Sequence, residues 1–144
     1  MPILNEEDEP EGIQNFDLME WLDGGGSSTG EGNLGLVDVR DDDFADFGHI
    51  KGSLHYSVDD FELNLEKFLD EIKSKKFNDI VFICMYGEMR SPSALQLFLS
   101  YLQDLKNSDP DSFEDIDVKV WYLVGGIGRF VTEFGIDNYV LETS

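Results

Sequence analysis

The chain of 144 residues contains a single cysteine, Cys84. One thiol excludes an intrachain disulfide, and it excludes a zinc site built from several cysteines. A chain of this length buries enough apolar surface to fold without such crosslinks, so we expect neither a metal nor a cofactor. The absence of disulfides is typical of a reducing compartment. We therefore expect a cytoplasmic location, with the nucleus as the alternative.

Basic residues are also scarce. Ten Lys and Arg stand against 31 Asp and Glu, which gives a formal net charge of −21 at pH 7. A surface this acidic repels a phosphate backbone and anionic lipids, so we expect no nucleic-acid binding and no membrane binding. Protein partners that carry basic residues are favoured, because complementary charge accelerates encounter.

No run reaches the roughly 18 apolar residues of a membrane-spanning helix. The first eight residues are acidic rather than cationic, which is not typical of a signal peptide. Residues 1–31 hold nine acidic residues and neither Lys nor Arg. We expect an acidic disordered arm over residues 1–12, then one domain over residues 13–144 that contains a flexible Gly- and Ser-rich segment at residues 24–30.

Short apolar runs alternate with helical patterns in this domain. Four runs predict strands, at residues 34–39, 54–57, 80–84 and 118–124. Two helices are predicted from apolar stripes. One stripe consists of Phe61, Leu65, Phe68, Leu69 and Ile72, and the other of Leu95, Phe98, Leu102 and Leu105. This alternation indicates an α/β domain with a mainly parallel sheet.

Local signals predict where other helices begin. A capping-box pattern at residues 17–20 predicts a helix within residues 13–23, with a buried face formed by Phe16, Met19 and Leu22. Ser91 is the expected N-cap of the helix that carries the second stripe, with Pro92 at its first position. A last short helix is expected over residues 129–134, after a glycine-rich turn.

The connection that follows the strand at residues 80–84 carries the candidate chemistry. It begins at Cys84 and ends at Arg90, and ligands of open α/β sheets bind at this end of the strands. N–H groups at a helix N-terminus and a guanidinium bind anions together, and they favour the thiolate of a cysteine. We predict Cys84 and Arg90 as catalytic residues, in a phosphate-binding loop formed by Met85, Tyr86, Gly87, Glu88, Met89, Arg90 and Ser91. The alternative, in which Cys84 is only a small core residue, stays open here.

Other polar and aromatic residues are expected to be structural. His49 and His55 lack the neighbours of a metal site, and Asp38 with Arg40 reads as an ion pair at the end of a strand. The run of three aspartates at residues 41–43 is typical of a solvated surface. Trp21 and Trp121 are expected in the core, as no basic residues are interleaved with them.

Four segments carry a resemblance to a known family: residues 36–40, 48–56, 84–93 and 123–130. In order and spacing they resemble the rhodanese-like domain, within it the branch of the M-phase inducer phosphatases and the small eukaryotic arsenate reductases. The resemblance covers about residues 13–134. It implies a three-layer fold, in which helices flank a five-stranded, mostly parallel sheet.

The length of the loop separates activities within that family. Sulfurtransferases typically have a loop one residue shorter, and the seven residues from Cys84 to Arg90 resemble the phosphatase and arsenate reductase branch. The resemblance implies a protein tyrosine or dual-specificity type of phosphatase, acting on a phosphorylated protein or a small phosphoester through a phosphocysteine. Glutathione-dependent arsenate reduction at the same loop is the first alternative. A catalytically weak phosphate-binding or interaction module is the second.

Two residues depart from the family pattern. The family usually has His before the cysteine, where this chain has Ile83. Glu88 adds a carboxylate to the loop, which disfavours an anion unless the side chain turns away or pairs with Arg90. Both departures lower the expected activity. By resemblance, the hydroxyl of Ser91 is expected to hydrogen-bond the thiolate.

Overall fold

The computed structural model describes residues 11–24, 33–41, 49–50, 52–111, 118–134 and 141–142. Residues 1–10 of the expected arm, residues 25–30 of the glycine-rich segment, and both Asp42 and Asp43 lie outside the described residues. Gly12, which was expected to end the arm, belongs to a strand.

Within the described residues, five parallel strands form one sheet, which confirms the predicted fold class. Their spatial order is β1 (Gly12–Ile13), β6 (Lys119–Leu123), β5 (Phe77–Ile83), β2 (Asn33–Asp38) and β4 (Leu54–His55). A separate antiparallel pair joins β3 (His49–Ile50) to β7 (Leu141–Glu142). Strands β1, β3 and β7 were not predicted, because each has only two residues and none lies in a longer apolar run of the kind that predicted β4.

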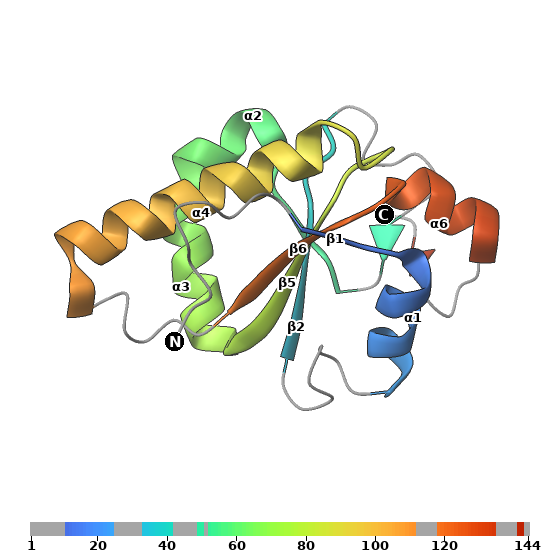
Figure 1. Ribbon diagram of the computed structural model, residues 1–144, viewed down its shortest axis with the longest axis horizontal. Helices are drawn as coiled ribbons and strands as arrows, with labels where there is room; N and C mark the ends of the chain where they lie inside the picture. Colours follow the sequence, from blue (N-terminus) through green and yellow to red (C-terminus); the bar gives the residue numbers. More distant parts are fainter. Residues whose placement is uncertain are drawn as a thin grey trace.

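Helices cover both faces of the sheet and make the three layers that were expected (Figure 1). One face carries α2 (Val58–Phe61), α3 (Leu65–Lys75) and α4 (Arg90–Ser108), with the 3-10 turn η1 (Glu62–Asn64) between the first two. The other face carries α1 (Asn15–Gly24) and α6 (Gly126–Phe134).

The central strand β5 and the two residues after it divide their side chains between the two layers, because successive residues of a strand face opposite sides. The side facing α3 and α4 receives Ile80, Phe82 and Cys84. The side facing α1 and α6 receives Val81, Ile83 and Met85. Ile83 is therefore a core residue, 1% exposed, on the opposite side of the strand from the Cys84 side chain.

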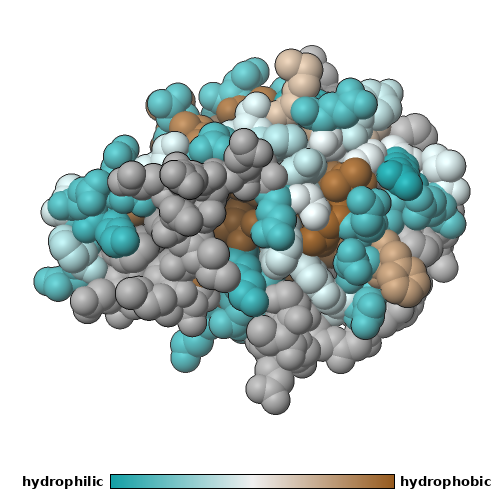
Figure 2. Space-filling view, viewed as in Figure 1, coloured by the Kyte–Doolittle hydropathy of each residue, from teal (hydrophilic) through white to brown (hydrophobic). Residues whose placement is uncertain are grey.

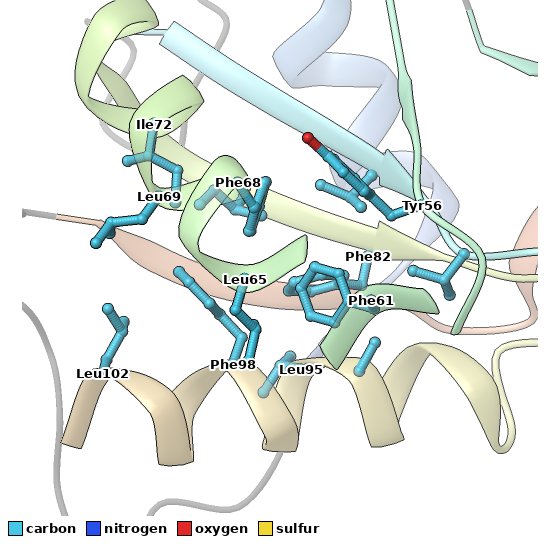
Figure 3. Close-up of a cluster of buried hydrophobic side chains, with 14 of the residues drawn as sticks. Tyr56, Phe61, Leu65, Phe68, Leu69, Ile72, Phe82, Leu95, Phe98 and Leu102 are labelled. Atoms are coloured by element: carbon cyan, nitrogen blue, oxygen red, sulfur yellow. The ribbon is translucent and has the colours of Figure 1, made fainter. Parts of the chain in front are cut away.

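The core beneath α3 and α4 contains most of the two predicted stripes, together with strand residues such as Phe82 (Figure 3). Phe61, Phe68, Phe82 and Phe98 are fully buried and pack mostly edge to face. The helix expected around the first stripe is divided into α2, η1 and α3, and it ends where Lys76 adopts a left-handed conformation with φ 55°. The break leaves all five predicted side chains buried.

The predicted buried face of α1 was wrong in part. Phe16 is 71% exposed, whereas Leu18 is fully buried. Asp17 does not cap the helix; it lies in the first turn and its carboxylate accepts a hydrogen bond from the Gln14 N–H at 3.4 Å. Because Ile13 pairs with Leu123 in the sheet, the chain enters the helix at a fixed angle that turns Leu18 inward.

On the face shown in Figure 2, most of the coloured surface is hydrophilic, and hydrophobic residues lie in a few separate areas. None of the helices that the structure describes is long and apolar enough to cross a membrane.

Replacing Phe68 with Ala should lower the free energy of unfolding by about 3–5 kcal/mol, because its ring contacts three other phenylalanines in a closed core. Urea unfolding followed by fluorescence measures the change. The control is Leu63→Ala, at a side chain 84% exposed, which should change stability by less than about 0.5 kcal/mol. Similar losses in both variants would contradict the packing described here.

Candidate active site

The predicted loop lies at the carboxyl end of the sheet. Cys84 follows the last residue of β5, and Arg90 is the first residue of α4. The two candidate catalytic residues are thus held by the central strand and by the longest helix among the described residues. The loop between them closes over the sulfur of Cys84.

Two hydrogen bonds surround that sulfur. The N–H of Gly87 donates to Cys84 Sγ at 3.1 Å, and Ser91 Oγ lies 3.2 Å from the same atom. Gly87 has φ +69°, which bends the loop back toward its own beginning. Cys84 is 2% exposed, so its sulfur lies at the floor of the loop, where two donors can stabilise a thiolate.

Ser91 does not cap α4, contrary to the prediction. The helix begins one residue earlier, at Arg90, and its N-cap Met89 makes no side-chain cap bond. Ser91 is fully buried in the first turn, and this position directs its hydroxyl to the Cys84 sulfur. The hydrogen bond expected from the family resemblance is therefore present.

Arg90 is half-buried, with 28% of its side chain exposed, and it forms an ion pair with Asp41. Its NH1 atom lies 3.8 Å from Asp41 Oδ2. Asp41 was expected to belong to a solvated run of aspartates, so its place beside the loop was missed. Glu88 is exposed, which is the arrangement that keeps a loop carboxylate compatible with a bound anion.

The remaining loop residues differ in exposure. Met85 is buried in the core, whereas Tyr86 and Met89 are 66% and 76% exposed. Two large side chains that are mainly apolar therefore lie at the surface of the loop.

A buried ion pair supports the strand next to the loop. The Arg40 guanidinium binds the Asp38 carboxylate through Nε and NH2, at 2.9 and 2.8 Å, and both residues are almost fully buried. The N–H of Val39 donates to the Ile83 carbonyl at 2.8 Å, directly before Cys84. Breaking such a pair costs about 3–5 kcal/mol, so the predicted structural role of Asp38 and Arg40 fits their geometry.

A cavity of about 560 Å³ is lined in part by Asp41, the residue that forms the ion pair with Arg90, so it lies beside the loop. The other residues that line the cavity are His55, Tyr56, Ser57, Asp59, Asp60, Asn64 and Lys67. Three carboxylates and one ammonium group make its wall acidic. The ring of His55 lies 2.6 Å, through Nε2, from the Arg40 carbonyl oxygen, a structural contact of the kind expected, and His49 is buried in β3.

Tyr56 is not a candidate base in this cavity. Burial, and then the hydrogen bond to Glu71 and its charge, raise the pKa of Tyr56 above its ordinary value of 10.0. The phenol thus stays protonated at neutral pH. In the described parts of the chain, no group of three or more His, Cys, Asp or Glu is placed to hold a metal ion.

The arrangement of fold and loop agrees with comparisons to known proteins. A family model described as Rhodanese-like domain matches residues 18–133. The chain belongs to the rhodanese-like domain family.

Relatives of this rhodanese-like domain are named as phosphatases and arsenate reductases. The CDC25-like phosphatase YCH1 of Saccharomyces cerevisiae is 29% identical over 133 residues, which cover 86% of this chain and 83% of that protein. Arsenate reductase 2.2 of Oryza sativa subsp. japonica is 38% identical over 86 residues, which cover 60% of this chain and 59% of that protein. The chain spans about half, 49%, of the dual specificity phosphatase Cdc25 of Arabidopsis thaliana, at 32% identity.

Solved structures show the same fold. A crystal structure of a Saccharomyces cerevisiae homolog of single-domain rhodanese and the Cdc25 phosphatase catalytic domain has a TM-score of 0.72 at 28% identity, and covers 90% of this chain and 85% of that one. The As-Sb reductase from Leishmania major has a TM-score of 0.70 at 23% identity, and covers 90% of this chain and 82% of that one. At the latter identity the likeness concerns the fold alone.

Replacing Ser91 with Ala should slow alkylation of Cys84 by iodoacetamide at pH 7 by roughly tenfold, because a hydrogen bond to a charged group contributes about 1.5–3 kcal/mol. Mass spectrometry follows the reaction, and the single cysteine makes the product unambiguous. The matched control is Ser93→Ala, at an exposed side chain in the same helix turn, which should alkylate like the wild type. Equal rates in all three proteins would show that Ser91 does not act on the sulfur.

Proposed function

We propose that this rhodanese-like domain is a cysteine-dependent phosphatase of the protein tyrosine or dual-specificity type. The observation that carries the proposal is the position of the Cys84 sulfur at the floor of a seven-residue loop. There it accepts a hydrogen bond from the Gly87 N–H and contacts the Ser91 hydroxyl. Arg90 ends the loop at the N-terminus of α4. The yeast relative named as a CDC25-like phosphatase, which matches over most of both chains, supports the same activity.

The reaction would proceed in two displacements. The Cys84 thiolate attacks phosphorus and forms an S–P bond, while the ester O–P bond breaks and the leaving oxygen takes up a proton. A water molecule then attacks the phosphocysteine, which releases inorganic phosphate and restores the thiolate. Each step retains the oxidation state of sulfur and phosphorus, so no cofactor is needed.

The loop would stabilise the charge that develops on the phosphoryl oxygens. We assign this role to the backbone N–H groups between Met85 and Ser91 and to the fork of the Arg90 guanidinium. An incoming phosphoester competes with Asp41 for Arg90, because both are anions.

Hydrolysis of p-nitrophenyl phosphate tests the proposed activity. We expect Cys84→Ser to abolish turnover and Arg90→Lys to lower kcat/KM by about a hundredfold, since a lysine cannot provide the bidentate contact. The control is Arg129→Lys, at an exposed arginine paired with Glu133, which should stay within twofold of the wild type. Turnover that persists in Cys84→Ser would exclude this mechanism.

Arsenate reduction is the second candidate, favoured by the 38% identity to the rice arsenate reductase. Cys84 would displace water from arsenate to form an S–As bond. Two electrons must then come from external thiols such as glutathione, which are oxidised to a disulfide as arsenite leaves, because this chain has no second cysteine. Glutathione-dependent arsenite release from arsenate supports this reaction.

Anion binding without either turnover would instead support the interaction module, and sulfur transfer from thiosulfate to cyanide would support a sulfurtransferase.

The acidic cavity beside Arg90 supports a preference for phosphorylated proteins with a basic residue near the phosphate. The phosphoryl group would lie in the loop while a lysine or arginine side chain enters the cavity wall formed by Asp41, Asp59 and Asp60. The net charge of −21 acts in the same direction, because it repels substrates that are uniformly anionic.

A pair of phosphopeptides that differ only in Arg or Gln beside the phosphorylated residue tests this preference. The ratio of kcat/KM for the Arg peptide over the Gln peptide should exceed one and should fall about threefold in Asp59→Asn, the size expected for a partly exposed ion pair. Glu62→Gln removes the same charge from the surface outside the cavity and should leave the ratio unchanged. An equal ratio in Asp59→Asn and the wild type contradicts the assignment of the cavity.

A further inference from the structure

A set of contacts between the loop and the first turn of α6 has no role in the chemistry described above. The N–H of Ile127 donates to the Cys84 carbonyl, and the N–H of Gly128 donates to the Met85 carbonyl, both at 2.9 Å. These N–H groups belong to the first turn of a helix, where no intrahelical partner exists. The α6 turn therefore binds the first two carbonyls of the loop.

The contact is so close that it requires glycine on both sides. A Cβ atom added to Gly126 would lie 2.4 Å from the Cys84 carbonyl oxygen and 2.5 Å from that of Met85. A Cβ atom added to Gly87 would lie 2.3 Å from the Leu123 carbonyl oxygen. Both glycines also have positive φ, +65° for Gly126 and +69° for Gly87. Backbone packs directly on backbone along this contact.

The direction of the two carbonyls determines the direction of the neighbouring amides. In a planar trans peptide the N–H points opposite to the preceding C=O. Because the Cys84 and Met85 carbonyls point to α6, the N–H groups of Met85 and Tyr86 point away from it. An anion loop works only when its amides converge on one point, so the carbonyls must be held outward.

We propose that Gly126, with the N–H groups of Ile127 and Gly128, positions the loop for anion binding by holding its carbonyls against α6. Gly126 is a positioning residue that does not touch the substrate. The inference deepens the proposed function and also applies to arsenate, since both anions need the same amides. It gives the glycine-rich turn after β6 a role in the site.

Substitution at two glycines separates this contact from backbone strain. Gly126→Ala pushes a methyl group into the loop carbonyls. Gly52→Ala has the same kind of strain, at φ +83°, but its methyl group would meet nothing within 4 Å.

The readout is protection of Cys84 from iodoacetamide by inorganic phosphate or arsenate, measured by mass spectrometry, which needs no turnover. We expect Gly126→Ala to raise the anion concentration needed for half-protection more than tenfold. Gly52→Ala should stay within threefold of the wild type. Equal weakening in both variants would overturn the proposal, because strain alone would then explain the loss.

Gly128→Ala keeps the test decisive if Gly126→Ala does not fold. Gly128 lies inside α6, where Ala is the better helix former, so thermal stability should be retained or raised. The added methyl group would lie 3.1 Å from the Met85 carbonyl oxygen and would displace it slightly. A stable Gly128→Ala protein with about threefold weaker anion protection supports the proposal, and unchanged protection contradicts it.

These outcomes are distinguishable from failure of the proposed function. If wild-type protein is protected by phosphate but does not hydrolyse p-nitrophenyl phosphate, the phosphatase proposal fails while the glycine variants still test the loop. If hydrolysis is present, the loss in Gly126→Ala should appear in both KM for the phosphoester and half-protection by phosphate. A loss in kcat alone, with normal protection, would contradict a positioning role.

Discussion

The hydrogen bond from the Gly87 N–H to the Cys84 sulfur is the interaction on which the site depends, because it closes the loop over its own first residue. Such closure is possible only if the end of β5 is immobile. The hydrogen bond from the Val39 N–H to the Ile83 carbonyl holds that end from one side. The first turn of α6 holds the carbonyls of the next two residues, Cys84 and Met85. The buried pair of Asp38 and Arg40 fixes the neighbouring strand in turn.

The same loop reconciles two interpretations of a buried cysteine. Cys84 is 2% exposed and belongs to the hydrophobic core cluster, as an inert thiol would. Its sulfur nevertheless has polar donors within hydrogen-bonding distance, Gly87 and Ser91, which an inert core thiol does not need. Burial beneath the loop keeps water from the sulfur, and in the proposed reaction the anion would reach the sulfur from the loop side.

The acidic residues near the loop lie where they are compatible with the proposed anion site. Glu88 is exposed at the loop, and Asp41 forms an ion pair with Arg90. In the proposed phosphatase, the three carboxylates of the cavity would favour a basic residue next to the phosphate. The short-range donors of the loop would outweigh the repulsion of a highly acidic protein, since salt screens its field within about 10 Å.

The sequence by itself determined the class of fold, the apolar stripes of α3 and α4, and the sulfur and guanidinium at the two ends of the loop, because these follow from local periodicity and spacing. Only the tertiary structure decided the buried face of α1 and the roles of Asp41 and Gly126. Those features arise where segments far apart in the chain meet. Such meetings depend on strand pairing and helix packing, which no local pattern encodes.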